Sequence, residues 1–156
     1  MNKLSHYDPE GNVRMVDVSE KTTTARRAVA SASVLLNEET LAVLKAGENP
    51  KGNPLEIARI AGIMAAKRTA ELIPLCHQIN LTKVDVRIEI AENGVRLEAE
   101  AKTASQTGVE MEALTAATIA ALTIYDMCKA VQKDIVITDV KLDLKTGGKS
   151  DYVSGQ

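Results

Sequence analysis

The chain has 156 residues, 45% apolar and 26% charged, with a net charge of −2; this predicts a single domain, 1–156, and excludes overall disorder. The negative charge and the scarcity of aromatic residues, three tyrosines without Phe or Trp, exclude nucleic-acid binding through basic patches or base stacking. No apolar run reaches membrane length and the two cysteines form no motif, so we expect a cytoplasmic protein with reduced thiols and no membrane contact.

The first third of the chain predicts two strands and one helix. Residues 1–12 are polar and expected to be flexible. Residues 13–18 alternate loosely, as in a short edge strand, while the small and β-branched residues of 28–36 fit a longer strand, although the pattern leaves a helix open there. An asparagine before residues 38–46 and a glycine after them predict a capped helix over that range.

A second helix follows a loop of glycine, proline and asparagine at residues 47–54, with one cation, Lys51, in its middle. A lysine in such a loop is either solvated or holds an anion, and the sequence leaves both readings open. Asn53 is placed to cap a helix that starts at Pro54, and the apolar periodicity continues to about Leu72.

The second half of the chain supplies the clearest strands. Apolar and charged residues alternate over 83–90 and again over 95–102, separated by Asn93-Gly94, which is typical of a type I′ hairpin turn. Residues 135–145 alternate with a change of phase near Thr138, which indicates a bulge. Residues 146–156 are rich in Gly and Ser and are expected to be flexible.

Between these strands, residues 107–133 predict one long helix that is apolar around most of its circumference and therefore buried. Glu112 and Asp126 fall on its narrow polar strip but lie about 21 Å apart along the axis. Either only one of them is functional, or a second chain supplies its copy of the other. A core helix with ordinary ion pairs is the alternative. The order of elements predicts an α+β fold, ferredoxin-like βαββαβ, with an antiparallel sheet and helices packed on one face.

Few local patterns point to chemistry. Asp126 and Lys129 stand one helical turn apart, as a surface ion pair or as a proton-transfer pair with a partly buried lysine. Cys76 beside His77 has no second ligand pair at a usual spacing, so no metal site is predicted. The KTGGKS segment at 145–150 fails as a phosphate loop because Asp143 stands where a glycine is required.

Six stretches are distinctive: MVDVS (15–19), KG (51–52), ARIAGIMAAKRT (58–69), LIPLCH (72–77), TGVEMEALTAATIAALTIYDMCKAVQKD (107–134) and GGKS (147–150). They closely resemble the cyclic pyranopterin monophosphate synthase family of molybdenum cofactor biosynthesis. Together they extend over nearly the whole chain. The family usually continues LIPLCH with proline, where this chain has Gln78.

The resemblance implies a lyase that converts 3′,8-cyclo-7,8-dihydro-GTP into cyclic pyranopterin monophosphate and releases pyrophosphate. It also implies a homohexamer, a trimer of dimers, with active sites at subunit interfaces. No cofactor is implied, and whether Mg²⁺ accompanies the triphosphate stays open. The competing reading is a non-catalytic ferredoxin-like module that binds a small ligand and regulates another protein.

Carried over by motif, the implied site comprises residues of four segments: Lys51; Leu75, Cys76 and His77; Met111 and Glu112; Asp126 and Lys129. Glu110 is a further candidate. We assign Asp126 and Lys129 as the acid/base pair, and Lys51 and His77 as groups that orient the substrate or its phosphates. Glu112 and Met111 would contact the base end of the substrate, and Lys67 and Arg68 would add positive charge.

Overall fold

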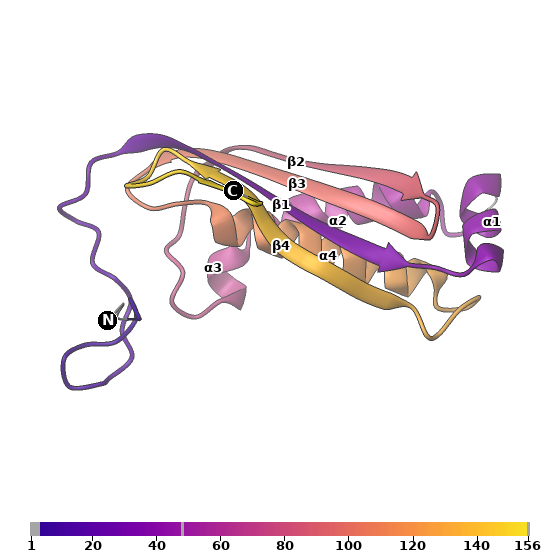
Figure 1. The fold of residues 1–156 in the computed structure, drawn as a ribbon, viewed down its shortest axis with the longest axis horizontal. Coiled ribbons are helices and arrows are strands. Elements are labelled where there is room, and N and C mark those ends of the chain that lie inside the picture. The colour runs from indigo at the N-terminus through magenta and orange to yellow at the C-terminus, as the bar shows by residue number, and fades with distance from the viewer. Residues whose placement is uncertain (1–3, 48, 156) are drawn as a thin grey trace.

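The computed structural model describes residues 4–47 and 49–155, and it has the predicted α+β, ferredoxin-like fold (Figure 1). The antiparallel sheet has the strand order β2-β3-β1-β4-β5, and α2 and α4 pack on one of its faces. The elements are β1 (Thr24–Leu35), α1 (Glu38–Ala46), α2 (Pro54–Ala66), α3 (Thr69–Leu72), β2 (Leu81–Ala91), β3 (Gly94–Ser105), α4 (Glu110–Cys128), β4 (Val136–Thr146) and β5 (Tyr152–Val153).

The core between sheet and helices is built from small side chains. The inward residues of β1 and β3 meet a row of buried alanines along α4. Gly62 shows how close this packing is, because a Cβ there would lie 2.8 Å from the Ala116 carbonyl oxygen. Without aromatic side chains in the core, α2 and α4 approach each other and the sheet closely, which fixes the position of α4.

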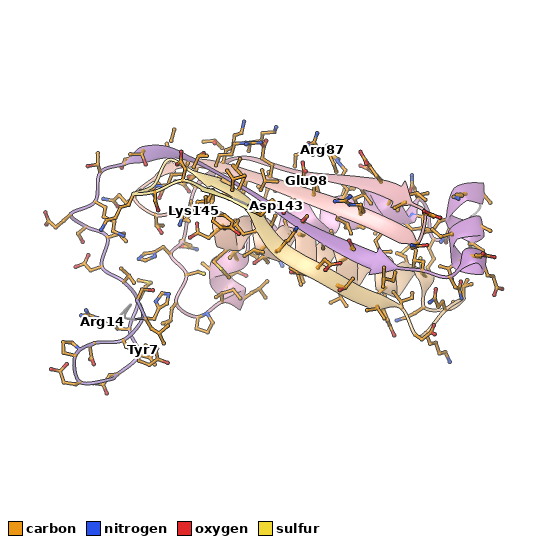
Figure 2. The ribbon with its side chains drawn as sticks, in the orientation of Figure 1. Tyr7, Arg14, Arg87, Glu98, Asp143 and Lys145 are labelled. Atoms are coloured by element: carbon orange, nitrogen blue, oxygen red, sulfur yellow. The ribbon has the colours of Figure 1, made fainter. Side chains whose placement is uncertain are left out.

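The opposite face of the sheet is covered by ion pairs (Figure 2). Arg87 pairs with Glu98, and Glu100 binds both Lys83 and Arg27, at 2.8 and 2.5 Å. The hydrogen bond from Lys83, with those charges, lowers the pKa of Glu100 to about 2, against the effect of its partial burial. Many charges of this face are therefore paired within a single chain.

Two local predictions are confirmed. The Asn37 side chain accepts a hydrogen bond from the Thr40 N–H at 2.9 Å and caps α1, which Gly47 ends with φ 69°. The predicted bulge near Thr138 appears as a register shift between β1 and β4, with φ 54° at Asp139.

Three local predictions are wrong. Residues 13–18 form no strand, and only an isolated bridge joins Tyr7 to Val13. The helix expected to reach Leu72 breaks after Ala66. The buried Thr69 hydroxyl donates to the Ala66 carbonyl at 2.9 Å, and this bond competes with the backbone hydrogen bond that the carbonyl would accept in a continuous helix.

The third concerns the hairpin between β2 and β3. Its two loop residues are Glu92 and Asn93, neither with positive φ, so the turn is not type I′. Gly94 lies in β3 instead, where a Cβ would come 1.9 Å from the Val34 carbonyl oxygen. The glycine is required by this close approach of β1 and not by the turn.

Both ends of the long helix also differ from the expected range. Helix α4 begins at Glu110 and ends at Cys128. Beyond its C-terminal end the chain turns back over the helix, where the Tyr125 hydroxyl donates to the Lys133 carbonyl at 3.0 Å. Near the C-terminus, Tyr152–Val153 pair with β4, and the expected flexibility of 146–156 stays a prediction. In the part of the chain that the structure describes, no helix is long and apolar enough to cross a membrane.

Candidate active site

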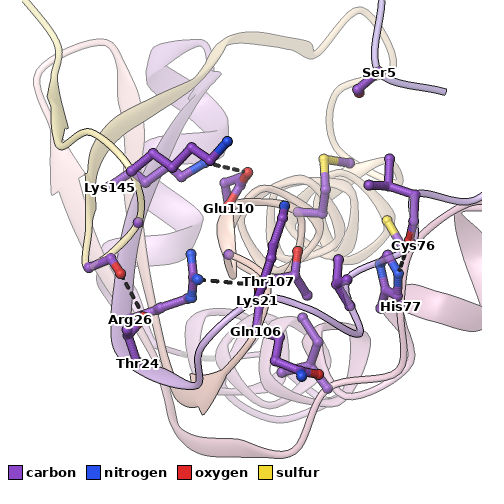
Figure 3. Close-up of a pocket in the computed structure, with 18 of the residues that line it drawn as sticks. Ser5, Lys21, Thr24, Arg26, Cys76, His77, Gln106, Thr107, Glu110 and Lys145 are labelled. Atoms are coloured by element: carbon purple, nitrogen blue, oxygen red, sulfur yellow. Dashed lines mark hydrogen bonds and ion pairs between the residues drawn. The ribbon is translucent and has the colours of Figure 1, made fainter.

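A cavity of about 650 Å³ lies where α4 begins, a size suited to a nucleotide-sized ligand (Figure 3). Five segments line it: the N-terminal arm, the start of β1, the segment after α3, the loop before α4 with the first turn of that helix, and the end of β4 with the loop after it. These segments are far apart in sequence, and the pairing of β1 with β3 and β4 brings them together.

Two carboxylates project into this cavity from the first turn of α4. Glu112 is only 3% exposed, and its Oε2 atom has no hydrogen-bond partner among the described residues. Glu110 binds Lys145 Nζ through Oε1 at 2.8 Å, while its buried Oε2 is equally unpartnered in the described part of the chain. Buried polar atoms without partners are rare and indicate a missing ligand or water. The prediction that Glu112 lies on a polar strip is wrong, because the cavity wall covers it.

Burial, with a smaller contribution from the charge of Glu110, raises the pKa of Glu112 to about 7 against the effect of an opposing backbone hydrogen bond. A carboxyl group that titrates near neutrality can both give and take a proton during turnover. Such a group at the wall of a cavity is a candidate for chemistry, since perturbed pKa values gather at functional sites.

The raised pKa predicts a specific pH dependence of stability. The folded state holds the Glu112 proton longer than the unfolded state, so its stabilising contribution is complete below pH 4.5 and lost as pH rises to about 7. The loss is on the order of 3 kcal/mol. Glu112→Gln removes it, so the variant should gain stability relative to wild type between pH 5 and pH 8 in urea titrations. A constant difference would contradict the buried, protonatable carboxyl.

Four cations that sequence reasoning missed also line the cavity: Lys21, Arg26, Lys145 and Lys149. Arg26 donates to the backbone carbonyls of Ser105 and Gln106 at 3.0 and 3.2 Å, contacts that orient its guanidinium without neutralising it. With three carboxylates at the wall, Glu20, Glu110 and Glu112, the cavity keeps a positive balance. It therefore suits an anionic ligand.

The end of β4 and the loop after it carry two of these cations, Lys145 and Lys149, and the loop is held against β1. Thr24 donates its hydroxyl proton to the Gly147 carbonyl at 2.7 Å, and Gly147 has φ 88°. A Cβ at Gly147 would lie 2.0 Å from the Ala25 carbonyl oxygen, so only glycine allows this approach. The signal for these cations was the KTGGKS segment, which fails as a phosphate loop yet lies in the cavity wall.

The segment after α3 contributes three of the predicted site residues, Leu75, Cys76 and His77. His77 Nε2 lies 2.7 Å from the Val16 carbonyl oxygen and must carry the proton in that bond, which leaves Nδ1 as an acceptor in the neutral ring. Burial, then the charges of Glu112 and Glu110, raise the pKa of the Cys76 thiol, which disfavours a nucleophilic thiolate.

Five of the eight predicted site residues thus share one cavity: Leu75, Cys76, His77, Met111 and Glu112. The other three, Lys51, Asp126 and Lys129, are absent from its wall. Asp126 and Lys129 lie at the far end of α4, and Lys51, in the loop before α2, is close enough to lower the pKa of Asp126. Lys67 and Arg68, expected as added cations, do not line it either. Within one chain the predicted site is divided into two parts.

The far part of the site is exposed. Asp126 Oδ1 lies 2.6 Å from Lys129 Nζ, and their side chains are 61% and 55% exposed. The hydrogen bond and charge of Lys129, with a further effect of Lys51, lower the pKa of Asp126, and Asp126 in turn raises the pKa of Lys129. In a single chain this is a surface ion pair, so the expected partly buried lysine is not found there.

The fold and the cavity together define an α+β protein with a positively charged site for a small anionic ligand. Residues 15–148 match the MoaC family, and the chain belongs to this family. It is 56% identical over 151 residues to a cyclic pyranopterin monophosphate synthase of Chloroflexus aurantiacus, covering 96% of this chain and 93% of the relative. It is also 53% identical over 154 residues to one of Heliobacterium modesticaldum, covering 97% of each.

Proposed function

We propose that this protein converts 3′,8-cyclo-7,8-dihydro-GTP into cyclic pyranopterin monophosphate with release of pyrophosphate, in molybdenum cofactor biosynthesis. The observation that carries the proposal is a cavity with four cations and two carboxylate oxygens that have no partner among the described residues, in a chain similar over nearly its full length to synthases of that name. The enzyme would act as a lyase in the cytoplasm.

The residues of the cavity fit the steps of this reaction. A triphosphate requires cations, which Arg26, Lys145 and their neighbours supply. Opening and closing of the purine-derived rings require proton transfers at nitrogen and oxygen, within the range of Glu112 and the imidazole of His77. A sugar-derived hydroxyl then attacks the α-phosphorus, so that a new P–O bond forms, the α–β anhydride bond breaks and pyrophosphate leaves. Preplaced cations stabilise the charge on the leaving group.

The site is proposed to be completed by a second chain. Glu112 and Asp126 lie about 21 Å apart along α4, too far for one small substrate to contact both within one copy. Asp126 and Lys129 of one chain, with its Lys51, would close the cavity of another and act as acid/base pair and phosphate ligand. A homohexamer built as a trimer of dimers would provide such pairs of chains.

No resident cofactor is proposed, because carboxylate, amine and imidazole groups suffice for the proton transfers. Mg²⁺ would enter only as a companion of the triphosphate. The proposal therefore predicts turnover by metal-free protein with the cyclised substrate, with added Mg²⁺ changing the rate and not the product.

The test of the function is turnover itself. Purified protein incubated with the cyclised GTP derivative should release one pyrophosphate for each cyclic pyranopterin monophosphate formed, measured by phosphate release and by mass spectrometry. Binding of the substrate without any conversion would favour the alternative, a non-catalytic ligand-binding module, in which Asp126 would affect affinity alone.

Lys51→Ala tests the contribution of the loop before α2. Lys51 is exposed, and its backbone N–H donates to the Asn49 side chain at 3.0 Å, a loop contact that does not depend on the lysine side chain. The variant should therefore lose at most about 0.5 kcal/mol of stability while pyrophosphate release falls sharply. Glu38→Ala, at an exposed site on α1, is the control for general surface effects. Wild-type substrate affinity and turnover in Lys51→Ala would exclude Lys51 from the site.

A further inference from the structure

A second imidazole lies in the cavity wall and has no part in the reaction steps proposed above. His6, in the N-terminal arm, lines the cavity, and its Nδ1 atom is buried without a hydrogen-bond partner among the described residues. Of the four buried side-chain atoms that lack a partner in the described part of the chain, three belong to this cavity, from His6, Glu110 and Glu112. Because such atoms are rare, their concentration here indicates polar groups that a ligand or its water satisfies.

A small hairpin in the arm holds His6 in place. Tyr7 and Val13 pair in an antiparallel bridge, and the Arg14 N–H donates to the His6 carbonyl at 2.9 Å. The Asp8 side chain closes the intervening turn, where it accepts a hydrogen bond of 2.7 Å from the backbone N–H four residues later. The backbone of His6 is therefore fixed at the root of the hairpin, next to the cavity.

Core packing does not account for this hairpin. Tyr7, Val13 and Met15 are 49%, 60% and 52% exposed, so the arm buries little apolar surface. Farther along the arm, the Val16 carbonyl accepts the 2.7 Å hydrogen bond from His77 at the cavity wall. The arm is thus connected to the site and not to the core, which favours a role for the His6 ring toward the ligand.

The cavity has two chemically different ends. Figure 3 shows Arg26 and Lys145 on one side of it, and Ser5 and His77 on the other. Ser5 directly precedes His6 at a turn of the chain, and both residues line the wall, so His6 belongs to the second end. A triphosphate is drawn to the end that carries the cations. The ring system of the same ligand would then lie at the end that carries His6.

We propose that His6 hydrogen-bonds the purine-derived ring system of the substrate. The inference rests on the proposed function in one respect, that the ligand joins such a ring system to a triphosphate. A neutral imidazole offers one N–H donor and one acceptor nitrogen. The edges of a guanine-derived ring carry carbonyl and ring-nitrogen acceptors and an amino donor. The arm thereby adds a polar contact at the base end, where Met111 and Glu112 are expected.

Binding of two probes tests this contact. Isothermal titration calorimetry of the full chain with GTP, which carries the guanine ring, should show about 5- to 10-fold weaker binding in His6→Ala, the effect of one hydrogen bond. Tripolyphosphate, which lacks the ring, should bind wild type and variant alike. Unchanged GTP affinity in His6→Ala would overturn the proposal. An equal loss of affinity for both probes would also overturn it, because the substitution would then have loosened the arm and its Lys21.

Two further variants separate a hydrogen bond from a general effect on the arm. His6→Gln keeps an amide donor and acceptor and should bind GTP more tightly than His6→Ala does, whereas equal weakening would contradict the hydrogen bond. Val13→Ala truncates an exposed apolar side chain in the same hairpin and should bind both probes as wild type does. A loss of GTP affinity in Val13→Ala as large as in His6→Ala would assign the effect to the hairpin and overturn the contact.

Turnover of the cyclised substrate distinguishes this inference from the proposed function. If His6 binds the ring system, His6→Ala should raise KM for that substrate by a factor similar to its loss of GTP affinity and should change kcat less. Wild-type turnover together with unchanged KM and kcat in His6→Ala would refute the contact alone. Weaker GTP binding by His6→Ala, combined with no turnover by wild type, would refute the function alone.

Discussion

Lys129→Ala is expected to abolish pyrophosphate release while the protein stays folded. Lys129 caps α4 through its backbone N–H, which donates to the Tyr125 carbonyl at 2.9 Å and does not depend on the side chain. Its ion pair with Asp126 is exposed and contributes little to stability. Loss of a general acid or base, however, lowers turnover by about 10²–10⁴-fold. Initial rates of pyrophosphate release and thermal melting separate the two effects.

Two further variants define the role of Lys129. Lys129→Arg keeps the charge but cannot give up its proton, so it should not restore activity. Lys133→Ala removes an exposed lysine four residues farther along the chain and should turn over normally. Near wild-type turnover by Lys129→Arg would make Lys129 a phosphate-binding cation and would end its assignment as an acid or base.

The sequence predicted well those parts of the fold where burial of one face makes apolar residues recur at regular intervals. The inward residues of β3, from Val95 to Ala101, alternate because one face of the strand packs on α4 while the other is solvated. The end of α2 at Ala66 was not predictable from the spacing of apolar residues, because that spacing continues beyond Ala66. It depends on the contact of one threonine hydroxyl with the preceding turn.

Site residues were predictable from the sequence only where they stand within a distinctive local motif. Cys76, His77 and Glu112 stand in distinctive segments and do share a cavity. Arg26 was missed because the antiparallel pairing of β1 with β3 and β4 brings it to that cavity, and no local pattern in the sequence indicates this. The burial of Glu112 has the same origin, since other segments cover the first turn of α4.

An active site shared between two chains predicts that two inactive variants complement each other when their subunits are mixed. Glu112→Ala and Lys129→Ala should each be inactive alone, because each removes one half of every site. After mixing, a dimer of one chain of each kind contains one site with both wild-type residues and one with neither. Random pairing in an equal mixture should therefore restore at most about a quarter of wild-type activity.

Subunit exchange has to be shown in the same sample, by native mass spectrometry of an isotope-labelled variant mixed with an unlabelled one. Measuring pyrophosphate release from that exchanged mixture is the most direct test of the account. A recovery approaching one quarter of wild-type activity is the predicted result. An exchanged mixture that stays inactive would contradict the shared site and would leave Glu112 and Lys129 acting within separate or single-chain sites.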